Sequence, residues 1–217
     1  MSQIIKIGVL KTGCVGSSSL LEFLFDERAE RSDIEVEVSG TGPKIGVKQC
    51  KEAAYSILSK KPHLVLYIGP GQSISGPKEV RKILQEADIP TIVISDGPTI
   101  KIAKELTSNG FGYIIIGADS MIGARREFLD PVEMVLYNTD VMKVLAITGV
   151  LRILVDAIDR AIQCLKKGEP PELPHIVIDK EKAVEAGGFE NPYARSKAMA
   201  AYEISRHVAE LNVEGCF

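Results

Sequence analysis

Several turns in this sequence carry residue types that can hold an anionic or a flat ligand. The first, residues 11–17, places a lysine, two glycines and a serine where a helix is predicted to begin. Free backbone N–H groups and the helix dipole favour an anion at such a position. We predict ligand contacts from Lys11, Thr12, Gly13 and Ser17. An ordinary tight turn is the alternative, because the pattern is less specific than a Walker or dinucleotide fingerprint.

Two further turns, residues 69–73 and 95–98, combine glycine and proline without bulky side chains. Such turns let a ring system lie directly against the backbone. Turn chemistry alone would explain the glycines and prolines, but not why both turns follow neighbouring strands at the same end. We therefore predict that these turns line a ligand cleft, with contacts from Gly69, Pro70, Gly71, Asp96 and Gly97.

Charged and polar residues also gather after residue 123. Arg125 and Arg126 form either a solvated face or a clamp for carboxylates or phosphates, and their position alone slightly favours the solvated face. Asn138 and Asp140 interrupt the apolar face of the next predicted helix, so they are either exposed or line a cleft.

The sequence contains no arrangement that is typical of acid–base, nucleophilic or metal chemistry. It has no defensible Ser-His-Asp order, no close pair of carboxylates in a plausible pocket and no histidine in a strand-ending turn. Its four cysteines form no CxxC pair, so we expect no metal site. We therefore predict positioning residues and no catalytic side chain. Direct hydride transfer between two bound organic molecules is compatible with such a site.

Two common nucleotide fingerprints are absent, which argues against two classes of enzyme. Neither G-x-x-x-x-G-K-[ST] nor G-x-G-x-x-G occurs in the chain. An NTPase and an ordinary nicotinamide dehydrogenase therefore lose their main support.

The elements that position these turns alternate regularly over residues 1–119. Apolar, β-branched runs alternate with helical patterns, and this alternation predicts a doubly wound, mostly parallel α/β sheet of five strands. Acidic residues in the second strand place it at an edge and favour the order 2-1-3-4-5. For residues 120–217 we predict a helical subdomain with one short β segment. The five predicted strands are residues 4–10, 34–38, 64–68, 91–94 and 113–116.

Composition excludes several partner classes. The chain has 217 residues, 45% of them hydrophobic, which is enough for a substantial core. With 26 basic and 29 acidic residues its net charge is −3, so we expect no nucleic-acid partner. We also expect no membrane segment and no export signal, and therefore a cytoplasmic protein.

The stretch GARREFLDPVEM at residues 123–134 closely resembles the archaeal coenzyme F-420-dependent methylenetetrahydromethanopterin dehydrogenases. The resemblance covers essentially the whole chain. Family sequences continue for several tens of residues past the terminal Glu-Gly-Cys-Phe, so the resemblance implies a member that lacks a C-terminal segment. They also carry cysteine and asparagine where Thr12 and Cys14 stand. Further matching stretches are residues 11–17, 26–29, 137–138, 142–146, 189–194 and 213–217.

The resemblance implies a reversible hydride transfer. Reduced coenzyme F-420, a 5-deazaflavin, would give a hydride to methenyltetrahydromethanopterin and form methylenetetrahydromethanopterin, in methanogenesis or its reverse. The resemblance also implies a homo-oligomer, a hexamer in the family. The nine turn residues named above would then bind the cofactor. Residues that would bind the one-carbon carrier are Arg125, Arg126, Glu127, Asn138 and Asp140.

Two alternatives stay open from the residues. One is a non-catalytic relative that binds a deazaflavin or a pterin without turnover. The other, from the fold alone, is a receiver-like or nucleotide-binding regulatory domain. The second lacks the acidic cluster that a receiver's metal needs, because Lys11 and Thr12 follow the first strand instead.

Overall fold

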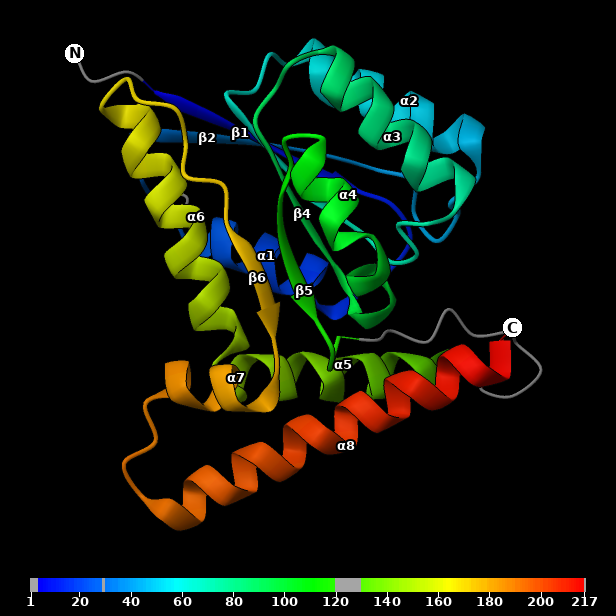
Figure 1. Ribbon diagram of the computed structural model, residues 1–217, viewed down its shortest axis with the longest axis vertical. Coiled ribbons are helices and arrows are strands. Elements are labelled where there is room, and N and C mark those ends of the chain that lie inside the picture. Colours follow the sequence, from blue (N-terminus) through cyan, green and yellow to red (C-terminus); the bar gives the residue numbers. More distant parts are fainter. Residues whose placement is uncertain (1–3, 29, 120–129, 217) are drawn as a thin grey trace.

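A computed structural model describes residues 4–28, 30–119 and 130–216, the last five of them as backbone only. Its centre is one sheet of six parallel strands in the order β2-β1-β3-β4-β5-β6 (Figure 1). The predicted doubly wound sheet and its order 2-1-3-4-5 are thus confirmed. The strands are β1 (Ile5–Lys11), β2 (Ile34–Gly40), β3 (Leu64–Ile68), β4 (Thr91–Asp96), β5 (Gly112–Ile116) and β6 (His175–Ile178).

The strand count differs from the sequence prediction by one. The segment expected as a short β element among the helices is β6, which pairs in parallel with β5. A parallel neighbour needs a long crossover, and α5 (Pro131–Thr148) and α6 (Val150–Lys166) lie between the two strands in the chain. The main sheet therefore includes a strand from beyond residue 119, while the division into residues 1–119 and 120–217 stays a prediction.

Helices cover both faces of the sheet, as apolar parallel strands require (Figure 1). One core packs α1 (Gly16–Glu27), α5 and α6 against one face, and it contains Leu21, Leu145 and Ile158. The other packs α2 (Val47–Ser59), α3 (Ser75–Glu86) and α4 (Ala103–Ser108) against the opposite face. A short 3₁₀ segment, η1 (Gly97–Ile102), precedes α4.

Two final helices, α7 (Lys180–Gly187) and α8 (Pro192–Cys216), complete the fold. The last helix begins at Pro192. It crosses the carboxyl ends of β5 and β6 (Figure 1), where Tyr202 donates a hydrogen bond to the carbonyl of Ile178 and Ser205 donates one to that of Ala118. The carboxyl edge of the sheet is therefore walled on one side by α8.

A capping residue fixes the start of α5. The Asp130 carboxylate accepts hydrogen bonds from the N–H groups of Val132 and Glu133, and Pro131 is the first helical residue. Glu133 completes a capping box with the Asp130 N–H. Within the described parts of the chain, the helices are all too short or too polar to cross a bilayer.

Candidate functional site at the carboxyl edge of the sheet

The structure brings three predicted turns together at the carboxyl edge of β1, β3 and β4. A Cβ atom on Gly69 would lie 2.3 Å from the Thr12 carbonyl oxygen, so only glycine permits this approach of the two turns. The Gly71 N–H lies 3.4 Å from Asp96 Oδ1 and links the second turn to the third. Residues 11–13, 69–71 and 96–97 therefore form one contiguous surface.

The glycine at position 13 serves the turn itself. Its φ angle is +69°, a region that side-chain-bearing residues rarely adopt. A Cβ there would also lie 2.9 Å from Ile45 Cγ2 and 3.2 Å from Pro70 Cδ. Gly13 is thus required by the backbone and by packing, whatever binds beside it.

The start of α1, predicted as an anion site, is occupied by a carboxylate of the protein. Asp119 Oδ1 accepts a hydrogen bond from the Gly16 N–H at 2.6 Å, and Oδ2 accepts one from the Ser17 N–H at 3.0 Å. The Asp119 side chain is fully buried. Burial raises its pKa to about 6, although the hydrogen bonds from Ser17 and Gly16 act in the opposite direction.

The lysine of the same turn is also engaged within the protein. Lys11 Nζ lies 2.5 Å from Oε1 of Glu22, which belongs to α1. The two side chains are 29% and 32% exposed. This pair holds the end of β1 against α1. The lysine predicted to attract an anion is thus paired with Glu22, and the N–H groups at the start of α1 are bound by Asp119.

Buried polar side chains fix the backbone of the second and third turns. Ser95 Oγ lies 2.7 Å from the Gly69 carbonyl oxygen and 2.7 Å from Thr99 Oγ1. Gln72 donates to the same Gly69 carbonyl, and the buried Arg81 guanidinium contacts the Gln72 side chain at 3.1 Å. These contacts hold the turn in a single conformation before any ligand arrives.

A second buried contact supports the first turn. Thr12 Oγ1 and the Tyr67 hydroxyl lie 3.0 Å apart, and both side chains are fully buried. Burial raises the pKa of the Tyr67 phenol, so this group stays protonated. Thr12 therefore faces the protein interior through its hydroxyl.

A cavity of about 390 Å³ opens beside the third turn, within the range of small-molecule sites. Two glycines form part of its wall. A Cβ on Gly97 would have no described atom nearer than 3.7 Å, and one on Gly117 none nearer than 3.5 Å. A Cβ at either position would therefore make ordinary van der Waals contacts without a clash. Its described lining residues are Asp96, Gly97, Pro98, Ile100, Lys101, Gly117, Asp119, Arg206, Ala209 and Glu210.

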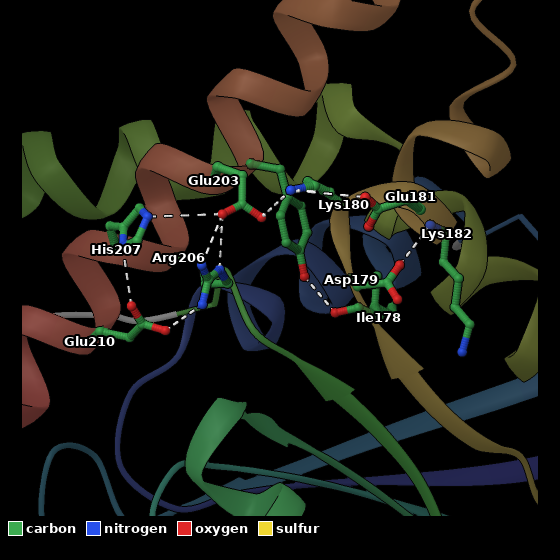
Figure 2. Close-up of polar contacts among 10 residues, drawn as sticks. Ile178, Asp179, Lys180, Glu181, Lys182, Glu203, Arg206, His207 and Glu210 are labelled. Carbon is green, nitrogen blue, oxygen red and sulfur yellow. Dashed lines mark hydrogen bonds and ion pairs between the residues drawn. The ribbon is translucent and has the colours of Figure 1, made fainter.

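The side of this cavity contributed by α8 is charged. Figure 2 shows Arg206 between Glu203 and Glu210; its Nη2 atom lies 2.9 Å from Glu203 Oε2, and its Nη1 atom contacts Glu210. Lys180, the first residue of α7, places its Nζ atom 3.4 Å from Glu203 Oε1. These cations lower the pKa of the Glu203 carboxyl. Arg206 also lines a neighbouring cavity of about 330 Å³ that reaches Tyr202.

The five residues predicted to bind the one-carbon carrier differ in their surroundings. Asn138 is half-buried on α5, one turn before Val141, whose side chain packs near Gly16. Asp140 is exposed and pairs with Lys143 at 3.0 Å. Arg125, Arg126 and Glu127 lie outside the described residues.

The residues predicted from the sequence include the three turns at this edge but not Asp119 or Arg206, which also line the cavity. Asp119 follows β5 as a single acid, and its partners stand more than a hundred positions earlier. Arg206 belongs to a helical charge pattern that is typical of a solvated face. The usable signal for Asp119 was its place in a strand-ending turn.

Comparison with known proteins gives one consistent family. A family model described as methylene-5,6,7,8-tetrahydromethanopterin dehydrogenase matches residues 5–217. The F420-dependent methylenetetrahydromethanopterin dehydrogenase of Archaeoglobus fulgidus is 52% identical over 217 residues, which are 99% of this chain and 78% of that protein. The enzyme of the same name from Methanocaldococcus jannaschii is 48% identical with the same coverage. These relatives are longer than this chain, as the sequence resemblance implied.

A solved structure gives the same result in three dimensions. It superimposes with a TM-score of 0.93 at 43% identity, covering 99% of this chain and 78% of that one. That protein is an F420-dependent methylene-tetrahydromethanopterin dehydrogenase in complex with methylene-tetrahydromethanopterin and coenzyme F420.

Proposed function

This chain belongs to the methylene-5,6,7,8-tetrahydromethanopterin dehydrogenase family, and on that basis we propose that it transfers a hydride reversibly between reduced coenzyme F-420 and methenyltetrahydromethanopterin. The product is methylenetetrahydromethanopterin, in archaeal one-carbon metabolism. The observation that carries this proposal is the match of the family model to nearly the whole chain, residues 5–217.

The proposed reaction needs no proton transfer from the protein's titratable groups. Coenzyme F-420 supplies the hydride when it is bound in its reduced form. The acceptor already carries a positive charge, so the hydride neutralises it without help from a general acid. The residues of this chain must therefore hold two rings in contact and exclude water.

The cavity beside the third turn fits a flat ring. Gly97 and Gly117 leave space where a Cβ would stand, and the buried contacts of Ser95 keep the adjacent backbone fixed. We place the ligand cleft along this edge. The residues assigned to it as positioning groups are Lys11, Thr12, Gly13, Ser17, Gly69, Pro70, Gly71, Asp96 and Gly97, with Asn138, Asp140 and the three charged residues 125–127 toward the carrier.

An anaerobic absorbance assay tests the proposed function. Purified protein is mixed with methenyltetrahydromethanopterin and reduced coenzyme F-420, and the return of the oxidised deazaflavin absorption is followed. Turnover with this pair, and none with NADH or NADPH in its place, is the expected result. Saturable binding of both ligands without turnover would instead identify the non-catalytic relative.

We also propose that the chain assembles with copies of itself. Three apolar side chains on α5, Val132, Val135 and Leu136, are each more than 60% exposed, as is Ile204 on α8. Neighbouring apolar groups that a monomer leaves in water are commonly buried against a symmetry mate.

A reaction between two diffusible molecules also fits a cytoplasmic enzyme.

A further inference from the structure

Two carboxylates line the same cavity, and their oxygens are used differently. Both oxygens of Asp119 accept backbone N–H groups at the start of α1. At Asp96 all three neighbouring polar groups surround Oδ1: the Gly71 N–H at 3.4 Å, Ser95 Oγ at 3.1 Å and Thr99 Oγ1 at 3.4 Å.

Among residues 4–28, 30–119 and 130–216, the second oxygen of Asp96 is therefore open to a ligand. In the part of the chain that the structure describes, no neighbouring residue donates a hydrogen bond to Oδ2. The side chain is half-buried and lines the cavity beside Gly97. A carboxylate in such surroundings gains from an external N–H donor, because charge-assisted hydrogen bonds are the stronger ones.

The two ligands of the proposed function differ in what they offer to a carboxylate. The pyrimidine edge of a pterin presents a ring N–H beside an exocyclic amino group, so two donors point the same way. The corresponding edge of a deazaflavin presents one N–H between two carbonyl oxygens. A carboxylate matches the first edge, whereas it meets the second with a repulsive oxygen on either side of the single donor.

We propose that Asp96 selects the pterin: its Oδ2 accepts from the 2-amino-4-oxopyrimidine edge of tetrahydromethanopterin, with Oδ1 held in place by Gly71, Ser95 and Thr99. This inference rests on the proposed function and refines it. It moves Asp96 from the residues expected to hold the cofactor to those that hold the one-carbon carrier. Asp96 acts by binding and orienting, and it takes no proton or hydride.

Asp96→Asn is the sharpest variant. The amide keeps one oxygen for the three groups around Oδ1 and replaces the other oxygen by an N–H donor, at nearly constant shape. We expect the dissociation constant of methenyltetrahydromethanopterin to rise at least about tenfold, since a charge-assisted bond is lost and two donors then face each other. The dissociation constant of coenzyme F-420 should stay within about twofold or fall, because an amide matches its edge.

Asp88→Asn is the matched control. Asp88 is exposed and lies just before the start of β4, at the end of the strand away from Asp96. Its φ angle of 52° is one that asparagine also tolerates. Neither dissociation constant should change with this control. Equal thermal transitions for the wild type and both variants establish that the fold is kept.

A second measurement needs no variant. Binding of 6-methylpterin and 6-methyllumazine to the wild-type protein is compared, because lumazine has a carbonyl in place of the amino group and so reproduces the deazaflavin edge. We expect the pterin to bind at least about tenfold more tightly. Equal affinity for the two would overturn the inference. So would an Asp96→Asn protein that binds the carrier normally, or one that loses only coenzyme F-420.

These outcomes are distinct from a failure of the proposed function. Wild-type protein that binds both ligands without turnover contradicts the proposed function alone, and the binding comparisons still test the role of Asp96. Normal wild-type turnover with an unchanged carrier affinity in Asp96→Asn contradicts only the role of Asp96.

Discussion

The carboxylate of Asp119 lies 2.6 Å from the backbone nitrogen of Gly16. Asp119, in the turn after β5, therefore caps α1, the helix that follows β1. Strands β3 and β4 lie between these two elements in the sheet. The contact therefore spans the edge where the candidate site lies. It fixes the start of α1 relative to the Gly117 wall of the cavity.

Asp119 should make stability depend on pH. Burial raises its pKa from 3.8 to about 6 in the folded protein. Between these two values the folded state binds more protons than the unfolded state, so its contribution to stability is greatest at low pH and is lost as pH rises through about 6. The full effect is on the order of 3 kcal/mol for a shift of this size.

Urea unfolding of the wild type and of Asp119→Asn at several pH values checks this. The difference in unfolding free energy between the two proteins should shift against the wild type as pH rises from about 4 to about 7. A difference that stays constant over this window would show that Asp119 does not titrate there.

The sheet could be predicted because four of its first five strands are short apolar runs closed by turns, and the second alternates apolar and acidic residues as an edge strand does. Leu64–Ile68, for example, is buried on both faces and can be read directly from its side chains. β6 was harder, because the four residues His175–Ile178 are separated from β5 by two long helices. A pairing partner at such a distance leaves no periodic signal in the chain.

The sequence allows site residues to be predicted only where backbone shape indicates an open turn, and those assignments stay predictions. Gly69 and Gly97 stand at strand ends, and their positions alone indicated a turn open to a ligand. The side chains of Asp119 and Arg206 gain their roles from partners or walls supplied by distant segments. Tertiary packing creates those relationships, so local spacing does not contain them.

Filling the cavity should reduce activity without unfolding the protein. Gly97→Leu and Gly117→Leu both place a side chain where a Cβ meets no described atom closer than 3.5 Å. Because the added group occupies the space of the ring, we expect kcat/KM to fall at least about a hundredfold. The measurement is steady-state turnover beside a thermal melt.

Gly46→Ala is the control for this pair. Its Cβ meets only the flexible Gln49 side chain, on the start of α2. Activity close to wild type is expected there. Full activity in both leucine variants would place the ring binding site elsewhere.

The buried guanidinium of Arg81 should be a strong determinant of stability. It is 4% exposed and contacts Gln72, which in turn holds the Gly69 carbonyl. Arg81→Met leaves these buried acceptors without their donor, so the unfolding free energy should fall by about 2–3 kcal/mol. Lys82→Met changes the next residue, whose side chain is 65% exposed, and should cost less than about 0.5 kcal/mol. Equal losses in the two variants would contradict the structural role of Arg81.

Assembly can be followed by light scattering over a tenfold dilution at micromolar concentration. We expect at least a dimer. Leu136→Glu should lower the measured mass, because it places a charge within the exposed apolar group on α5. A monomer mass of about 23.6 kDa for the wild type at every dilution would contradict self-association.

Transfer of an isotopic label tests the proposed reaction most directly. Coenzyme F-420 is reduced so that the transferable position carries deuterium, and the protein then converts methenyltetrahydromethanopterin in ordinary water. Direct transfer predicts one deuterium in the methylene group of the product, because a hydride that passes from carbon to carbon between two stacked rings does not exchange with water. A product that carries only hydrogen from water, or no product at all, would contradict hydride transfer between the two bound molecules.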